Sequence, residues 1–119
     1  MILVDTSVWI EHLRTGKSGL ESSLVEGEVL THPLVLGELA CGNIANRHVV
    51  LDLLLDLPLA QEASHQEAMA LIDKQRLMGR GIGFIEVQLL AATLITPLAK
   101  LWTFDRRLAK IAGELGVGV

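Results

Sequence analysis

The chain has 119 residues, half of them hydrophobic, and its ten Lys and Arg against fourteen Asp and Glu give a formal net charge of −4. This length suffices for one domain with a sizeable core and not for two, so we expect residues 1–119 to form a single domain. The acidic balance lacks the overall basic footprint of most nucleic-acid-binding proteins, so any contact with phosphates has to come from a local basic rim.

Neither a membrane span nor a secretion signal is expected. The most apolar stretch, residues 84–102, is interrupted by two charged residues, a glutamine and a proline. The N-terminus lacks a basic lead followed by an apolar run and a small-residue cleavage site. Cys41 is the sole cysteine, and its apolar neighbours favour a place in the core. We therefore expect a cytoplasmic protein.

Strand and helix signals alternate through the first half of the chain. Short apolar runs predict buried strands, and longer stretches bounded by proline or by capping residues predict helices. In chain order, the predicted elements are a strand from Ile2 to Asp5, a helix from about Ser7, a strand from Val29 to His32, a helix from Pro33, a helix from Ile44 to Leu57 and an extended piece from Pro58 to Ala60.

The second half continues the alternation. It predicts a helix from Glu62 to about Met78, a break at Gly79, Gly81 and Gly83, a helix that carries Glu86 and stops before Pro97, a strand from Lys100 to Thr103, a helix from Asp105 to Glu114 and an edge strand from Val117 to Val119. Gly116 fits the position just after the last helix. Alternating strands and helices favour an α/β fold with a parallel sheet.

Four carboxylates lie in apolar surroundings with no cation at the local spacings that could neutralise them: Asp5, Glu38, Glu86 and Asp105. Each aspartate ends a predicted strand and opens a helix, and neither glutamate has a basic residue three or four positions away. An unpaired buried carboxylate costs on the order of several kcal/mol, which a bound cation would offset. Oxygen ligands suit Mg²⁺ or Mn²⁺, and one cysteine with four scattered histidines offers no zinc site.

For each residue alone, a simpler interpretation stays open. Asp5 and Asp105 could be helix N-caps, and the two glutamates could face solvent. Neither aspartate has Glu or Gln three residues later, so a capping box is absent. The carboxyl ends of parallel strands meet in one crevice, where the two aspartates would converge. As a set, the four acids favour a divalent-metal site.

Four segments carry a family resemblance: Asp5 to Ile10, Gly37 to Leu39, Gly83 to Ala92 and Leu101 to Leu108. Together, in this order across the whole chain, they resemble the PIN-domain ribonucleases, and especially the VapC-type toxins of bacterial toxin–antitoxin pairs. The resemblance implies a three-layer α/β/α sandwich around a parallel sheet. It also implies a Mg²⁺- or Mn²⁺-dependent endoribonuclease, a homodimer, and inhibition by a cognate VapB-type antitoxin.

The resemblance assigns Asp5, Glu38 and Asp105 to the first, second and fourth acids of the family. Thr103 matches the hydroxyl residue two positions before the fourth acid, and Ser7 falls at the hydroxyl step after the first. A metal held by these acids would activate a water and neutralise the charge that develops on the phosphate. The resemblance also makes both hydroxyl residues, Ser7 and Thr103, candidates for substrate contact.

Glu86 departs from the family pattern, which usually has Asp as the third acid. The extra methylene still presents an oxygen ligand, but Mg²⁺ demands near-ideal octahedral geometry, so the position of that oxygen matters. This departure leaves an alternative open: a catalytically weakened PIN-fold module that binds RNA or a partner protein without efficient cleavage.

Five basic residues are candidates for RNA phosphate contacts: Arg14, Lys17, Arg80, Arg106 and Arg107. Arg106 and Arg107 are the strongest of these, because they directly follow Asp105. An ordinary solvated surface is the alternative for each, and Glu11 is spaced to pair with Arg14 on a helix.

Residues 49–57 carry more apolar side chains than one helix face needs, which predicts an apolar groove or dimer face that the antitoxin would cover.

Two other classes of protein also gather acids at the strand ends of a parallel sheet. A phosphotransfer receiver needs adjacent N-terminal acids and a late lysine at a strand end, and this chain has neither. A haloacid-dehalogenase-type phosphatase needs a second acid two residues after its nucleophilic aspartate, where Ser7 stands. A metal-dependent nuclease therefore fits the residues best.

Overall fold

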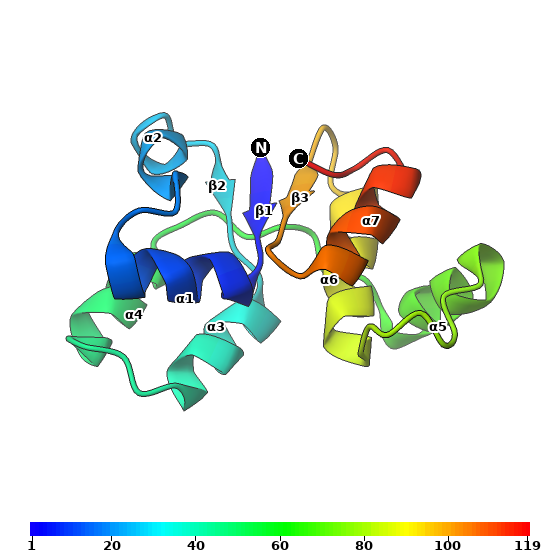
Figure 1. Cartoon of the computed structure of the whole chain (residues 1–119), viewed down its shortest axis with the longest axis horizontal. Helices are drawn as coiled ribbons and strands as arrows, with labels where there is room; N and C mark the ends of the chain where they lie inside the picture. The colour runs from blue at the N-terminus through cyan, green and yellow to red at the C-terminus, as the bar shows by residue number, and fades with distance from the viewer.

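Three parallel strands form the centre of the protein in a computed structural model that describes residues 1–119. They are β1 (Ile2–Val4), β2 (Val29–Leu30) and β3 (Lys100–Trp102), in the order β2-β1-β3 (Figure 1). In the middle strand, Leu3 lies opposite Leu30 on one side and Leu101 on the other. The predicted parallel sheet is confirmed, and β1 and β3 end side by side.

Single β-bridges widen this sheet at both edges. Leu59 pairs with Thr31 beyond β2, and Gly118 pairs with Leu101 beyond β3, both in the parallel sense. The extended pieces predicted at residues 58–60 and 117–119 are therefore present, although each is too short to count as a strand.

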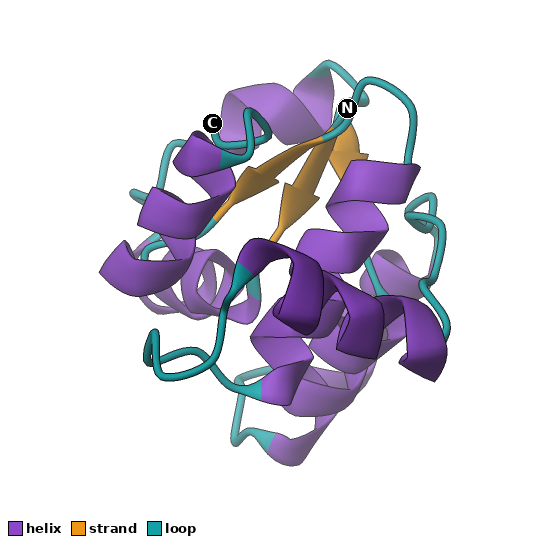
Figure 2. Ribbon diagram, turned by 90° about the vertical axis from the view of Figure 1, so that its right-hand side faces the viewer, coloured by secondary structure: helices purple, strands orange, loops and turns teal.

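Seven helices flank the sheet: α1 (Thr6–Thr15), α2 (Leu20–Val25), α3 (Pro33–Cys41), α4 (Arg47–Leu55), α5 (His65–Gln75), α6 (Phe84–Ile95) and α7 (Arg106–Glu114). Helices α1 to α4 lie on one side of the strands and α5 to α7 on the other (Figures 1 and 2). This is the expected α/β arrangement with helices on both sides of a parallel sheet. None of the helices combines the length and the apolar character needed to cross a bilayer.

The core includes β1 and the middle of α6. Leu3 and Val4 are fully buried, as are Leu89 and Leu90 on α6. A parallel strand covered on both faces reads as a continuous apolar run, which is why β1 shows no alternation. Burial of each such side chain contributes about 1.5–3 kcal/mol. We expect Leu90→Ala to cost about 2–5 kcal/mol because it would leave a cavity.

Local signals fix two of the helix ends. Ser64 and Glu67 form a reciprocal capping box, so α5 begins at His65, later than the predicted start at residue 62. Helix α7 ends in a Schellman motif, with Gly116 at a φ of 76° and the Val117 amide donating to the Ala112 carbonyl at 2.9 Å. This turn directs the chain back along β3, as Gly116 predicts.

One helix on this side of the molecule was not among the predicted elements, and two expectations are wrong. The unpredicted helix is α2, whose six residues include two serines, which form helices poorly. The helix predicted from Ile44 begins only at Arg47, since Asn46 adopts a left-handed conformation with φ of 53°. Cys41 is exposed instead of buried, because it lies in the last turn of α3, where its apolar sequence neighbours do not surround it.

Candidate active site

Asp5 lies at the carboxyl end of β1 with only 7% of its surface exposed. Its Oδ2 atom accepts hydrogen bonds from Ser7 Oγ and Thr103 Oγ1, both at 2.7 Å. Each hydroxyl has a single proton, so the 3.3 Å approach between the two hydroxyl oxygens is not a third bond. No protein donor bonds the other oxygen, Oδ1, and no basic side chain pairs with this carboxylate. Asp5 is therefore a buried, oriented carboxylate with one free oxygen.

Thr103 joins the two predicted aspartates. Its Oγ1 atom donates to Asp5 and accepts from the backbone amide of Asp105 at 3.0 Å. The Phe104 amide donates to Ser7 Oγ at 3.0 Å, so the turn after β3 is fastened to the first turn of α1. Register places these groups together, because Val4 and Trp102 are paired at the ends of neighbouring strands.

Asp105 also serves its own helix. Its Oδ1 atom accepts from the amides of Arg107 and Leu108 at 2.9 and 3.1 Å, which makes it the N-cap of α7. The simpler interpretation as a cap is thus correct for Asp105, whose Oδ2 atom stays free and exposed. It is wrong for Asp5, which stands before α1 but makes no side-chain cap bond.

Glu38 is half-buried on α3 and accepts a hydrogen bond at 2.7 Å from Thr6 Oγ1. Thr6 lies 32 residues away on α1, and the sequence analysis missed it. Its position directly after Asp5 marks Thr6 as a residue near the site, but no sequence signal points to its contact with Glu38. The carboxylate lines a shallow cavity of about 470 Å³ between α3 and the start of α6, together with Leu34 and Ile85.

Glu86 occupies the third position of α6 and makes no hydrogen bond or ion pair through its carboxylate. The side chain folds back over the helix start. Its Oε2 atom lies only 2.9 Å from the place that a Cβ atom on Gly83 would occupy. The positive end of the helix dipole stabilises a carboxylate there. Glu86 is half-buried, so neither the solvent-facing interpretation nor full burial describes it.

The four acids do not form a ready ligand set. No three His, Cys, Asp or Glu side chains lie close enough together to hold a metal ion. The expected burial holds for Asp5 alone, since Glu38 and Glu86 are half-buried and Asp105 is exposed. The donors nevertheless fit a hard divalent cation in kind, because each carboxylate keeps a free oxygen and none is paired with a cation.

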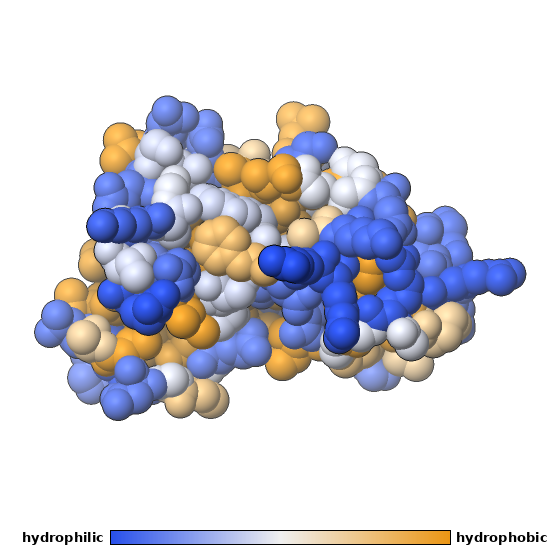
Figure 3. All heavy atoms as spheres, viewed as in Figure 1, coloured by the Kyte–Doolittle hydropathy of each residue, from blue (hydrophilic) through white to orange (hydrophobic).

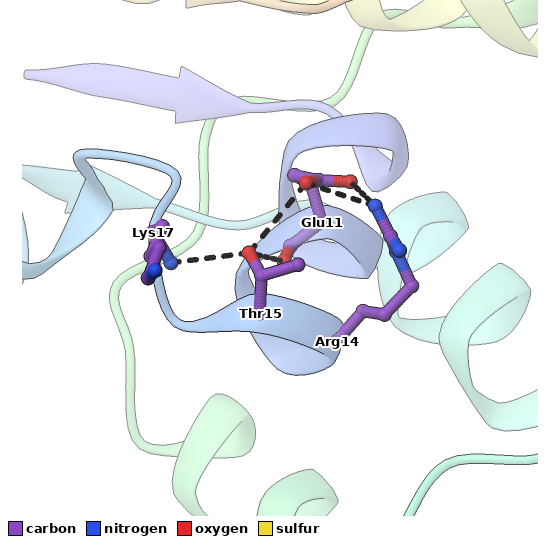
Figure 4. Close-up of polar contacts among 4 residues, drawn as sticks. All are labelled: Glu11, Arg14, Thr15 and Lys17. Carbon is purple, nitrogen blue, oxygen red and sulfur yellow. Dashed lines mark hydrogen bonds and ion pairs between the residues drawn. The ribbon is translucent and has the colours of Figure 1, made fainter.

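Arg14 is committed to an ordinary surface pair at the end of α1. Its Nη2 atom donates to both Glu11 oxygens at 3.0 and 2.8 Å, as the spacing predicts (Figure 4). Thr15 Oγ1 donates to the Glu11 carbonyl and accepts from the Lys17 amide (Figure 4). These bonds close the helix and offer no built site for phosphate.

Arg80 is likewise engaged, because its two terminal nitrogens donate to the two carboxylate oxygens of Glu114 at 2.8 Å each. Those hydrogen bonds hold the pKa of Glu114 below its ordinary value and raise that of Arg80. Arg106 and Arg107, by contrast, are exposed and have no acidic partner. Strongly hydrophilic side chains gather over α7 in Figure 3.

His32 caps α3, the helix that carries Glu38. Its ring is buried, and Nδ1 accepts from the Leu34 amide at 3.0 Å. Because Nδ1 is an acceptor, the neutral ring carries its proton on Nε2, which has no partner. Burial lowers the pKa of His32 below 6.5, and the nearby charge of Glu62 opposes that shift. The histidine is therefore a neutral structural cap.

Comparison with known proteins agrees with this architecture. The family model described as the PIN domain matches residues 2–114. Over all 119 residues the chain is 46% identical to the "Ribonuclease VapC32" of Mycobacterium tuberculosis, in strain CDC 1551 / Oshkosh and in strain ATCC 25618 / H37Rv, and the match spans 96% of that protein. The family that the four segments resemble is thus confirmed, and the chain belongs to the PIN domain family.

Proposed function

We propose that this protein is a Mg²⁺- or Mn²⁺-dependent endoribonuclease of the VapC toxin type, which hydrolyses RNA phosphodiester bonds as a single domain over residues 1–119. The observation that carries the proposal is Asp5, a buried carboxylate with no cation partner. Two hydroxyls fix its Oδ2 atom and leave Oδ1 available, as a metal ligand requires. Further support comes from a relative that is named a ribonuclease and is 46% identical over the whole chain.

The residues that would hold the metal are Asp5, Glu38 and Asp105, with Glu86 completing the set. When bound, the ion would activate a water and neutralise the charge developing on the scissile phosphate. The side chains of this protein orient the ligands. Ser7 and Thr103 both donate their hydroxyl protons to Asp5. We therefore propose that they orient the Asp5 carboxylate, instead of making the substrate contact expected from the sequence.

Arg106 and Arg107 are the residues that we assign to RNA. Both are exposed at the start of α7, next to Asp105, and neither has an acidic partner. The amino end of a helix adds positive potential, which favours phosphates at this place. Together they form the local basic rim that a protein of net charge −4 needs for binding RNA.

The direct test is cleavage of total cellular RNA by purified, antitoxin-free protein in Mn²⁺ or in EDTA, with the new RNA ends mapped. Wild type should make discrete cuts only with metal, and Asp5→Asn should make none while keeping its fold. Asp52→Asn is the matched control, because this exposed aspartate on α4 lies outside the candidate site. Equal cleavage by wild type and Asp5→Asn would refute the assignment.

A second candidate function is a catalytically weakened PIN-fold module that binds RNA or a partner protein without efficient cleavage. One observation favours it. The Glu86 carboxylate lies over Gly83 and accepts no hydrogen bond that would orient it, whereas Asp5 and Glu38 each accept one or more. In the same assay, cutting by Glu86→Asp with none by wild type would support that candidate. Efficient cutting by wild type would exclude it.

The antitoxin is proposed to cover the apolar face of α4. Val49 and Leu53, one helical turn apart, expose 61% and 64% of their surfaces, and apolar atoms are visible over the region of α1 and α4 in Figure 3. A groove of about 310 Å³ runs between these helices, lined by Trp9, Leu13, Leu24, Val50, Leu53, Leu54 and Leu57, with His12. An exposed patch of this kind lowers solubility, so the free toxin should precipitate at lower concentration than its complex. Equal solubility would count against this surface.

We also propose a homodimer acting in the cytoplasm, where a toxin directed at cellular RNA meets its substrate. A single exposed thiol agrees with a reducing compartment. Light scattering on the purified protein tests the dimer, because a mass of about 26 kDa is twice that of the 12.9 kDa chain. A monomer mass at micromolar concentration would contradict it.

A further inference from the structure

Two contacts fasten the glycine-rich segment 79–83 to α7. Arg80 forms a two-pronged pair with Glu114, and the partners are 34 residues apart. It is the only ion pair that joins distant parts of the chain, since the other one links Glu11 to Arg14 on α1. The second contact is between Gly81 and the Arg107 side chain, which would lie 2.6 Å from a Cβ atom at position 81.

These contacts join the segments that carry the third and fourth acids. Residues 79–83 lead directly into α6, where Glu86 occupies the third position. Helix α7 begins directly after Asp105, which caps it, and ends at Glu114. No hydrogen bond reaches the Glu86 carboxylate, so α6 alone places it, and the chain enters the first turn of α6 from the segment that is fastened to α7.

We propose that Arg80 and Glu114 are positioning residues that set the separation of Glu86 from Asp105 and thereby the geometry of the metal site. The inference rests on the proposed metal-dependent function. A bidentate arginine–carboxylate pair fixes direction as well as distance, which a single hydrogen bond does not. An exposed ion pair adds little to the free energy of unfolding. The contribution that we assign to this pair is therefore the placement of the segment before α6 relative to α7.

Gly81 is required for the same arrangement. Its φ of +83° is unfavourable for any residue with a side chain, and a methyl group there would displace the Arg107 guanidinium. Arg80 is less available to a phosphate than Arg106 or Arg107, because its charge is already paired with the Glu114 carboxylate through two hydrogen bonds. This is why we assign Arg80 to positioning and leave RNA contact to Arg106 and Arg107.

Calorimetric titration of the full-length protein with Mn²⁺ alone tests the inference. The variants are Arg80→Ala, Glu114→Ala and the charge swap Arg80→Glu with Glu114→Arg. We expect each single variant to weaken Mn²⁺ binding about 10-fold, as loss of a residue that orients metal ligands does. The swap should recover most of the affinity, because it restores an ion pair at the same place. Glu11→Ala with Arg14→Ala, which removes the other exposed pair, should bind Mn²⁺ like wild type.

Each outcome has a separate meaning. Wild-type affinity in both single variants, or a swap no better than they are, would overturn the positioning role and leave the proposed function standing. Absence of Mn²⁺ binding by wild type would overturn both. Loss of RNA cleavage with unchanged Mn²⁺ affinity in Arg80→Ala alone would make Arg80 an RNA contact and overturn the inference. Melting temperatures close to wild type would show that the variants are folded.

Discussion

The two halves of the candidate site are held in different ways. On one half, hydroxyls bond Asp5 and Glu38 from neighbouring elements at 2.7 Å, beside the parallel sheet. On the other half, Asp105 caps α7 and Glu86 folds back on its own helix start. The first half is held by side-chain hydrogen bonds between elements, and the second by helix ends. Changes in the first half should therefore affect stability and activity together, whereas in the second half a substitution that keeps the helix cap should affect activity alone.

The largest expected effect in the exposed half comes from Asp105→Asn. Asparagine caps helices about as well as aspartate, so the free energy of unfolding should change by less than about 0.5 kcal/mol. A charged metal ligand is lost, so Mn²⁺-dependent cleavage should fall at least about 100-fold. Cleavage rates and urea denaturation measure the two effects. Asp105→Ala serves as the comparison, because it should lose about 1 kcal/mol in addition to activity.

In the buried half, Thr103→Val removes the hydroxyl that joins Asp5 to the Asp105 amide without changing the side-chain volume. We expect about 10- to 100-fold weaker Mn²⁺ binding and a loss of about 1–3 kcal/mol in stability, since Asp5 loses a donor. Thr93→Val is the matched control, because this buried hydroxyl bonds only the Leu89 carbonyl of its own helix. If Thr103→Val retained wild-type metal affinity and stability, the two halves would not differ as described.

Thr6→Val should have a smaller effect. It removes the donor to Glu38 Oε1, but Glu38 is half-buried, so water can replace the lost bond. We expect Mn²⁺ affinity to fall about 10-fold, with a stability change of about 1 kcal/mol or less. Thr15→Val, at the exposed end of α1, is the control. A Thr6→Val protein that bound Mn²⁺ as wild type does would show that Glu38 needs no orientation by α1.

The smallest effect on activity is expected for His32→Asn, which tests how α3 is capped. The pKa of His32 is lowered in the folded protein, so the unfolded chain binds more protons as the pH falls through and below 6.5. Stability is then full above that pH and is lost as the pH falls. Asparagine keeps an acceptor for the Leu34 amide but does not titrate, so this part of the loss should disappear. Urea denaturation from about pH 5 to about pH 8 measures it, and equal slopes for both proteins would be the contrary result.

The strands and the buried half of the site were largely predictable from the sequence. An apolar run followed by an aspartate specifies a strand end, and neighbouring parallel strands bring such ends together, so Asp5 and Asp105 were expected in one crevice. Thr103 links them there. The contact between Thr6 and Glu38 could not be predicted, because it depends on how α1 crosses α3, which local periodicity does not encode. The pairing of Arg80 with Glu114 could not be predicted either, because the two residues are 34 positions apart and nothing near Arg80 in the sequence points to Glu114. Arg80 was therefore expected to contact phosphate.

Anomalous diffraction from crystals of this protein soaked in Mn²⁺ would show whether these carboxylates bind a metal. We expect one Mn²⁺ peak at the carboxyl end of β1, with the free Oδ1 atom of Asp5 within about 2.2 Å and oxygens of Glu38 and Asp105 in the same coordination shell. A peak elsewhere, or none with Asp5 still bonded only to Ser7 and Thr103, would contradict the assignment of these carboxylates as a metal site.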